Sequence, residues 1–166
     1  MDNDAKLDLY YTEHSINIRA KHPLILWVHG GGFVAGDKIE LSNYCKILAS
    51  KGFIVASADY SIAPGAHYPI PVSQINTAIA FLVRNESEFT IDTSKIILAG
   101  DSGGAHIVAQ LANIYTNKNY AVILGVTPSV DLANLRGVIL HCGAYNTALV
   151  DFEGGYGWFL RTVLWS

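Results

Sequence analysis

The chain has 166 residues, with 11 basic and 14 acidic side chains and a formal net charge of −3. Its length is typical of one domain, and its 51% apolar content excludes intrinsic disorder, which requires low hydrophobicity and high net charge. The acidic charge balance argues against nucleic acid or anionic membrane as a partner, because both require a basic patch. No apolar run reaches the ~18–20 residues of a membrane span.

Cysteine content and the first residues predict a cellular setting. Cys45 and Cys142 are too few for a disulfide scaffold, and residues 1–4 lack the basic end and apolar stretch of a signal peptide. We therefore expect a reducing, cytoplasmic location. The charged fraction of 15% is below the ~25% of an average domain. Either the chain buries an unusual share of its surface, or something else covers part of it.

Short apolar runs of strand length alternate with amphipathic helical patterns. The strands are expected at 24–28, 53–56, 95–99 and 137–140, and the helices at 41–48, 71–83 and 107–115. Continuous rather than alternating hydrophobicity is typical of parallel strands covered on both faces. The order predicts an α/β fold, a mostly parallel sheet with helices on both faces in three layers.

Two further segments are weaker. Residues 5–20 alternate between apolar and polar side chains and predict an antiparallel hairpin at the sheet edge. Residues 120–126 fit either a short strand or an apolar loop.

Gly100-Asp101-Ser102-Gly103-Gly104 satisfies the pattern G-x-S-x-G. It follows one predicted strand directly and opens a predicted helix, which is the context of a nucleophile elbow. Glycines at 100 and 104 let strand and helix approach without a Cβ clash, and Ser102 is pushed out at the carboxyl edge of the sheet. The same letters occur in chymotrypsin-like proteases, but those are antiparallel barrels whose histidine precedes the serine, and no helix follows it there.

His29-Gly30-Gly31-Gly32-Phe33 follows the first predicted strand. Successive glycines expose backbone N–H groups, which is what an oxyanion hole built from main-chain donors needs. A phosphate-binding loop is the main alternative, but the run lacks both the G-x-G-x-x-G spacing and the Lys-Ser/Thr of a P-loop.

With these motifs, the chain resembles the hormone-sensitive-lipase-like branch of the α/β-hydrolases over about residues 20–145. A third segment, Asp59-Tyr60-Ser61-Ile62-Ala63-Pro64, is similar to that family's Asp-Tyr-Arg-Leu-Ala-Pro-Glu segment. The resemblance implies that Ser102 is the nucleophile and that Gly31, Gly32 and Gly103 form the oxyanion hole. His29, Gly30, Gly100, Asp101 and Gly104 support the two motifs, and Phe33 borders the substrate pocket. Ser61 and Gly65 depart from the family's usual arginine and glutamate, and Gly103 from its alanine.

The resemblance implies a serine carboxylesterase or lipase acting on small acyl esters, with no cofactor and no metal. An amide-directed hydrolase, such as a formamidase or deacetylase, shares both motifs and remains an alternative. So does a catalytically incomplete fragment or pseudoenzyme, because the family's acid and histidine follow much later in the chain. His106 and His141 are weak candidates for the base, and nothing marks Asp131 or Asp151 as the acid.

Two expectations concern the later part of the chain. By the resemblance, residues 1–145 form the N-terminal part of the hydrolase core, and residues 146–166 begin a lid that is interrupted. The strand at 137–140 would then be an open apolar edge of the sheet, and such edges recruit other chains. The expected partners are therefore a small-molecule ester and, through this edge, a second copy of the chain.

Overall fold

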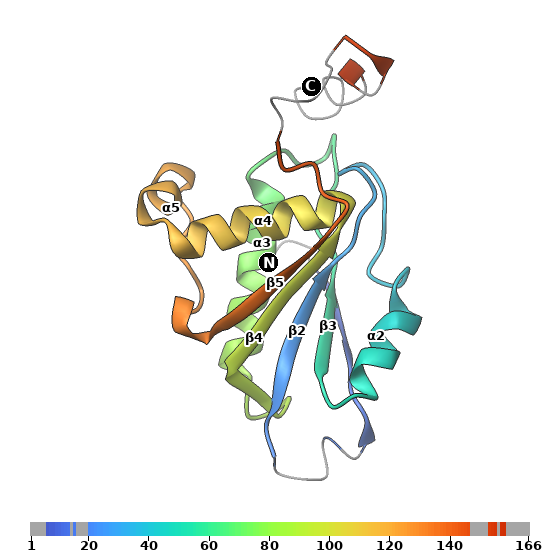
Figure 1. Cartoon of the computed structure of the whole chain (residues 1–166), viewed down its shortest axis with the longest axis vertical. Helices are drawn as coiled ribbons and strands as arrows, with labels where there is room; N and C mark the ends of the chain where they lie inside the picture. The colour runs from blue at the N-terminus through green and yellow to red at the C-terminus, as the bar shows by residue number, and fades with distance from the viewer. Residues whose placement is uncertain (1–5, 14, 16–19, 147–152, 156, 159–166) are drawn as a thin grey trace.

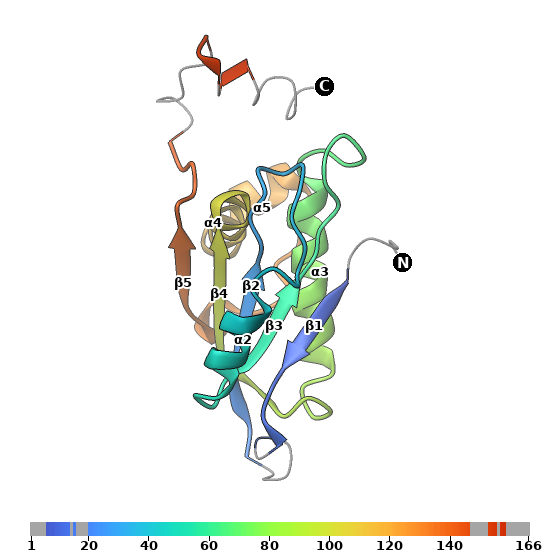
Figure 2. The same cartoon turned by 90° about the vertical axis from the view of Figure 1, so that its right-hand side faces the viewer.

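The computed structural model describes residues 6–13, 15, 20–146, 153–155 and 157–158. Five strands form one sheet in the order β1-β3-β2-β4-β5 (Figure 2). Their bounds are β1 Leu7–Tyr10, β2 His22–Val28, β3 Ile54–Ala58, β4 Ile91–Asp101 and β5 Leu135–His141. The last four are mutually parallel, and β1 runs antiparallel to β3. The predicted α/β fold is confirmed.

In the described part of the chain, four α-helices lie between these strands (Figure 1). They are α2 Ser42–Ala49, α3 Ile70–Arg84, α4 Ser102–Thr116 and α5 Lys118–Leu124, and a 3₁₀ turn covers Leu132–Asn134. The first three match the predicted amphipathic segments. In α3 a proline stands in the first turn, where its missing N–H has no intrahelical acceptor to lose.

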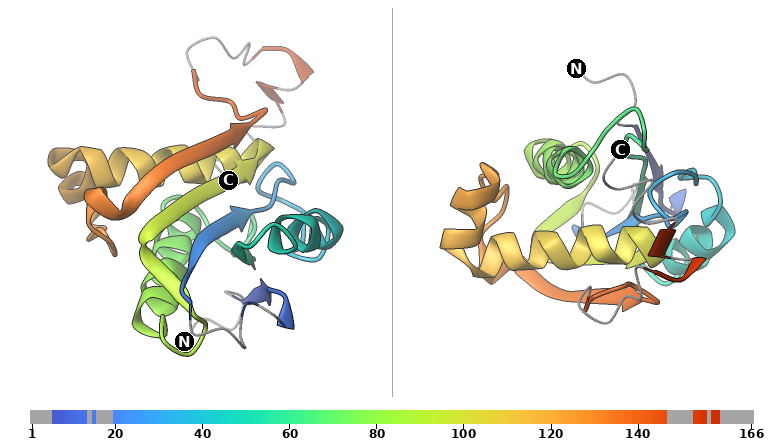
Figure 3. Two further views of the ribbon diagram at one scale, coloured as in Figure 1. Left: turned by 60° about the horizontal axis from the view of Figure 1, so that its bottom comes forward. Right: turned by 90° about the horizontal axis from the view of Figure 1, so that it is seen from above.

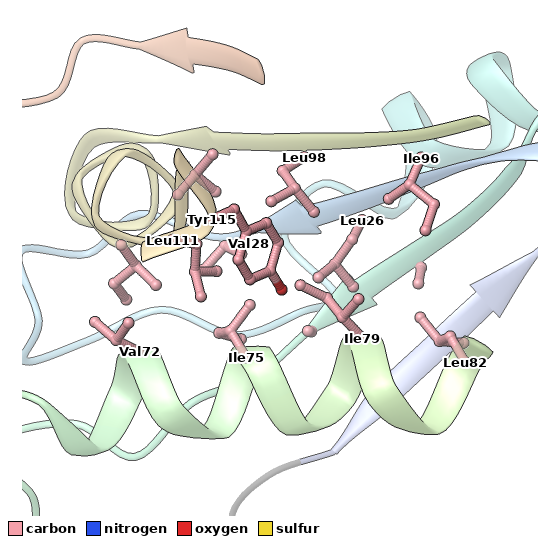
Figure 4. Close-up of a cluster of buried hydrophobic side chains, with 14 of the residues drawn as sticks. Leu26, Val28, Val72, Ile75, Ile79, Leu82, Ile96, Leu98, Leu111 and Tyr115 are labelled. Atoms are coloured by element: carbon pink, nitrogen blue, oxygen red, sulfur yellow. The ribbon is translucent and has the colours of Figure 1, made fainter. Parts of the chain in front are cut away.

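The two faces of the sheet are covered by different helices (Figure 3). Along β2, Leu24, Leu26 and Val28 belong to the core formed with α3 and α4, as the close-up in Figure 4 shows for part of that cluster. Ile25 and Trp27 belong to a second core that includes Cys45 and Ala49 of α2. Alternate side chains of one strand therefore enter two separate cores. This is the three-layer arrangement that the continuous apolar runs predicted.

Two expectations need correction. In place of the expected edge hairpin, the described residues within 5–20 contain one strand, β1, which pairs antiparallel with β3 at the sheet edge, so Leu7 lies opposite Ala58. Residues 120–126 lie mostly in helix α5. There the Asn117 side chain accepts hydrogen bonds from the amides of Asn119 and Tyr120, and Gly125 ends the helix in the left-handed conformation. These two caps outweigh the strand-like composition between them.

Strand β5 is the least covered part of the sheet. Among the described residues, it has a hydrogen-bonded neighbour, β4, on one side only. Its Val138 and Ile139 side chains remain 38% and 39% exposed, whereas every residue of β3 is buried. In the described part of the chain, β5 is therefore an open, partly apolar edge.

The expected lid at 146–166 falls largely outside the described residues and stays a prediction. In the part of the chain that the structure describes, no helix has the length and apolar character needed to cross a bilayer.

Candidate active site

Ser102 stands where β4 becomes α4. Asp101 is still extended, with φ −123° and ψ 146°, whereas Ser102 adopts φ +49°. A positive φ is unfavourable for a residue with a Cβ and persists only where the surroundings enforce it. The Ser102 side chain is exposed at the carboxyl edge of the sheet, beside the positive end of the α4 dipole. The predicted strand–turn–helix geometry of an elbow is therefore present around Ser102, and the role of Ser102 as a nucleophile stays a prediction.

Close backbone approach around the elbow requires its glycines. A Cβ placed on Gly100 would lie 2.6 Å from the carbonyl carbon of Gly104. A Cβ on Gly104 would lie 2.1 Å from the carbonyl oxygen of Val28, at the end of β2. The first residues of α4 are therefore pressed against both strands, and this packing holds the elbow in its strained conformation.

The glycine loop after β2 reverses direction in three consecutive left-handed residues. The φ angles are +108° at Gly31, +61° at Gly32 and +67° at Phe33. The carbonyl of Gly31 accepts hydrogen bonds from the amides of Val34 and Ala35, which closes the turn. Glycine is needed at Gly31, because a Cβ there would also lie 2.0 Å from the Ala35 carbonyl oxygen.

Backbone donors of the loop face the elbow. A Cβ placed on Gly103 would lie 3.3 Å from the amide nitrogen of Phe33 and 3.5 Å from that of Gly32. Within the described residues, no acceptor is found for the amides of Gly31, Gly32 and Phe33. The amide of Gly103, in the first turn of α4, has no intrahelical acceptor either. Several unused N–H groups thus gather next to Ser102, and that of Phe33 is one that the sequence did not single out.

His29 uses both ring nitrogens to hold this loop. Its Nδ1 lies 2.7 Å from the carbonyl oxygen of Gly30, to which it donates, and its Nε2 lies 3.5 Å from Asp59 Oδ1. The buried ring stacks on Tyr60, with centroids 4.5 Å apart, and the Tyr60 hydroxyl donates to the carbonyls of His29 and Gly30. Burial, followed by the charges of Asp101 and Asp59, raises the pKa of Tyr60 well above its usual value, so it remains a hydroxyl donor.

The segment around Asp59 is bound to the loop from its other side. The amide of Ala63 donates to the carbonyl of Phe33 over 2.8 Å. Ser61, which stands where the resembling family has arginine, exchanges two 2.8 Å hydrogen bonds with Gln74 of α3. A buried serine–glutamine pair thus fills this position, a network that the sequence did not predict.

Proton acceptors for Ser102 are missing from the described residues. His106 faces the Ala144 carbonyl, at 2.9 Å, and Gln110, and His141 stacks on Trp27. Within the described chain, neither histidine hydrogen-bonds to Ser102. Asp131 precedes β5. Because β4 and β5 are parallel, Asp131 lies at the amino-terminal end of these strands, whereas Ser102 lies at their carboxyl-terminal end. His14 and Asp151 lie outside the described residues.

An aromatic ring, that of Phe33, lies next to the elbow. The Phe33 ring meets that of His106 edge-on at 5.8 Å, beside Gly103, and its role as a border of the substrate pocket stays a prediction. No group of three metal-binding side chains is found in the described parts of the chain. A groove of about 520 Å³ lies along Asp59–Gly65 and excludes Ser102.

Comparison with known families decides the relationship. The profile of the BD-FAE family matches residues 7–146, a span that contains the elbow, the glycine loop and all five strands. The chain belongs to the BD-FAE family.

Relatives and solved structures agree with this membership. The chain is 35% identical to esterase LipI of Mycobacterium tuberculosis over 95 residues, which is 57% of this chain and 30% of LipI. It is similar to a bacterial heroin esterase, with 29% identity and a TM-score of 0.62 over 75% of this chain and 37% of the other. Esterase B of Lactobacillus rhamnosis superposes with a TM-score of 0.79 at 23% identity, over 97% of this chain and 56% of that protein.

These matches confirm the resemblance to α/β-hydrolase carboxylesterases that the motifs indicated. They also show that this BD-FAE chain spans about a third of the curated relative and about half of the solved esterase.

Proposed function

We propose that this chain carries the nucleophile and the oxyanion hole of a serine carboxylesterase or lipase site for small acyl esters. The Ser102 oxygen attacks the ester carbonyl carbon while a base takes the hydroxyl proton. The N–H groups of Gly31, Gly32 and Gly103 stabilise the oxyanion. Collapse of this tetrahedral intermediate breaks the bond to the alcohol oxygen, and the alcohol leaves after taking the proton from the base. Water then hydrolyses the acyl–serine ester.

One observation carries this proposal. An exposed serine in a left-handed conformation stands beside backbone amides that have no acceptor among the described residues. Both features cost free energy in a resting protein, because positive φ is strained and backbone donors are normally paired. A developing negative charge next to Ser102 would use those donors, and preorganised donors are worth ~10²–10³ in rate each.

The relatives support an ester substrate with a short acyl chain. Esterase B was solved with a tributyrin phosphonate, an analogue of a butyryl ester. In this chain the Phe33 ring next to Gly103 would border such an acyl group.

The base and its orienting acid are proposed to come from groups other than the described residues. His29 is fully engaged in holding the glycine loop, and His106 and His141 make other contacts. By itself, the 166-residue polypeptide should therefore turn over esters at less than ~1 s⁻¹, below the ordinary enzyme range.

A panel of substrates tests the proposal. Release of p-nitrophenol from acetyl, butyryl and octanoyl esters is measured for the chain and for Ser102→Ala, alongside N-formyl and O-acetyl compounds. We expect a slow component that depends on Ser102 and is largest for the short esters. In a polypeptide that also supplies base and acid, Ser102→Ala should lower turnover by about 10⁶-fold. Equal rates in both proteins would contradict the assignment of Ser102, and a preference for the N-formyl compounds would favour an amide-directed hydrolase.

We also propose a cytoplasmic location. Both cysteines are free thiols, and Cys142 is exposed, as expected for a protein kept in a reducing compartment. Fractionation of cells that express a tagged chain would place the protein, and recovery outside the cytoplasmic fraction would contradict this location.

A further inference from the structure

Asp101 lies between the nucleophile elbow and the glycine loop. Its Oδ1 accepts a 3.0 Å hydrogen bond from the indole Nε1 of Trp27, on β2. Its Oδ2 faces the first glycine of the loop, since a Cβ placed on Gly30 would lie 2.4 Å from it. One carboxylate thus contacts both segments from which the nucleophile and the oxyanion donors emerge.

The Trp27 indole is held in one orientation. Its side chain is 4% exposed. The Tyr44 ring of α2 meets it edge-on at 5.2 Å, and the His141 ring at the end of β5 stacks on it at 5.8 Å. Because rings from two other elements pack against the indole, the direction of its N–H is set before Asp101 binds it.

The position of this hydrogen bond in the sheet gives it a specific role. Backbone pairing of β2 with β4 ends at Val28 and Gly100. Asp101 is the next residue on β4, one step beyond the last pair and one step before Ser102. The Trp27–Asp101 bond therefore continues the coupling of the two strands past the point where the ladder stops.

We propose that Asp101 and Trp27 are a pair of positioning residues that fixes the distance between Ser102 and the amides of the glycine loop. Neither side chain touches the substrate in this account. The inference rests on the proposed function, since it assigns to the pair the alignment of that same site.

Hydrogen exchange tests the coupling without requiring activity. Exchange of the Val34, Ala35 and Ala63 amides, which are hydrogen-bonded to carbonyls of the glycine loop, is measured in Trp27→Phe, Asp101→Ala, Asp101→Asn and the double variant Trp27→Phe/Asp101→Ala. Trp27→Phe keeps one aromatic ring but removes the N–H donor together with part of the buried indole, so its effect is compared with that of Asp101→Ala, which leaves the indole intact. Asparagine retains an oxygen that accepts the indole N–H. We expect about 10-fold faster exchange in Trp27→Phe and Asp101→Ala, no further increase in the double variant, and a near-normal rate in Asp101→Asn.

The Val55 amide in the fully buried β3 reports global opening and serves as the internal control. An equal acceleration at Val55 would assign the pair to general stability and overturn the proposal. Additive effects of the two substitutions, or an Asp101→Asn rate like that of Asp101→Ala, would overturn it as well. If Asp101→Ala does not fold, the comparison of Trp27→Phe with the parent chain decides.

Labelling of Ser102 by a fluorophosphonate gives the second readout. The rate constant should fall about 10-fold in the same two variants and be retained in Asp101→Asn. A parent chain that does not label contradicts the proposed function, while the exchange rates still decide whether the pair couples loop and elbow. Normal labelling in Trp27→Phe contradicts the positioning role.

Discussion

Strands β3 and β5 share the same parallel sheet but lie in different surroundings. β3 is buried along its whole length between β1 and β2. In β5, five of the seven residues are exposed and the other two are half-buried, and among the described residues only β4 pairs with it. The elbow follows β4 and the glycine loop follows β2, and both of these strands have a paired neighbour on each side. Ser102 and the loop amides that we propose as oxyanion donors are therefore held by packing within this chain, whereas no described group beyond β5 supplies the proposed base.

The largest expected effect is the loss of a core side chain from the covered side. Leu26 of β2 is completely buried between β3, β4 and the α3–α4 layer. Leu26→Ala should lower the free energy of unfolding by about 3–5 kcal/mol, because the removed atoms leave a cavity. Ile139→Ala on β5 is the matched control and should cost less than about 1.5 kcal/mol. Urea unfolding followed by fluorescence measures both, and equal losses would break the distinction between the two strands.

The second largest effect is expected from adding one methyl group at a glycine, either next to the elbow or in β5. Gly104→Ala would place a Cβ 2.1 Å from the Val28 carbonyl oxygen, whereas a Cβ on Gly137 of β5 meets nothing within 4 Å. We expect a loss of about 2–3 kcal/mol for Gly104→Ala from overpacking and a change within about 0.5 kcal/mol for Gly137→Ala. Gly104→Ala should also slow the labelling of Ser102. Equal stability of both variants would contradict the close packing of the elbow.

The open edge is expected to bind a second copy of the chain. We propose that β5 mediates self-association, since unpaired edges with apolar side chains recruit other strands. Ile139→Lys should weaken association about 10-fold in sedimentation or light scattering, because a charge on the edge opposes pairing. Val122→Lys on α5, at an 80% exposed position, is the control and should have no effect. A parent chain that is monomeric at all concentrations would contradict this proposal.

The smallest expected effect belongs to a surface ion pair on β4, between Asp92 and Lys95. Hydrogen bonds from Lys95, and then from Ser94, lower the pKa of Asp92 to about 2 from 3.8. Because the folded value is the lower one, the stabilisation is present above about pH 4 and is lost as pH falls towards 2. Lys95 is more than half exposed, so Asp92→Asn should cost less than about 1 kcal/mol at pH 7, and this cost should shrink as pH falls through about 2. Thermal unfolding across this pH range measures it, and a loss as large at pH 2 as at pH 7 would contradict the assignment.

The parts of the fold that the sequence predicted are those determined by local pattern. Apolar runs marked four strands, and the letters around Ser102 marked the elbow because strand, glycines and helix are contiguous. The partner of β1 was missed, because side-chain alternation indicates a strand but not its neighbour. Helix α5 was missed although Asn117 and Gly125, its two caps, were visible in the sequence.

Contacts within the site were beyond prediction for a different reason. Trp27 and Asp101 are 74 residues apart, and Ser61 and Gln74 meet only because the loop and α3 pack together. Such pairs depend on how the elements pack together, and the local sequence pattern of each element does not indicate that packing. The same applies to the amide of Phe33, which faces Gly103 only once the loop has folded.

The most direct test of the central claim is the site of covalent modification by a fluorophosphonate, mapped by peptide mass spectrometry, together with ester turnover of the same sample. The account predicts one slow adduct, on Ser102, its absence in Ser102→Ala, and turnover below ~1 s⁻¹. An adduct on another residue, or no adduct after prolonged exposure, would contradict the assignment of the nucleophile. Fast labelling with turnover above ~1 s⁻¹ would instead show that the chain contains its own base.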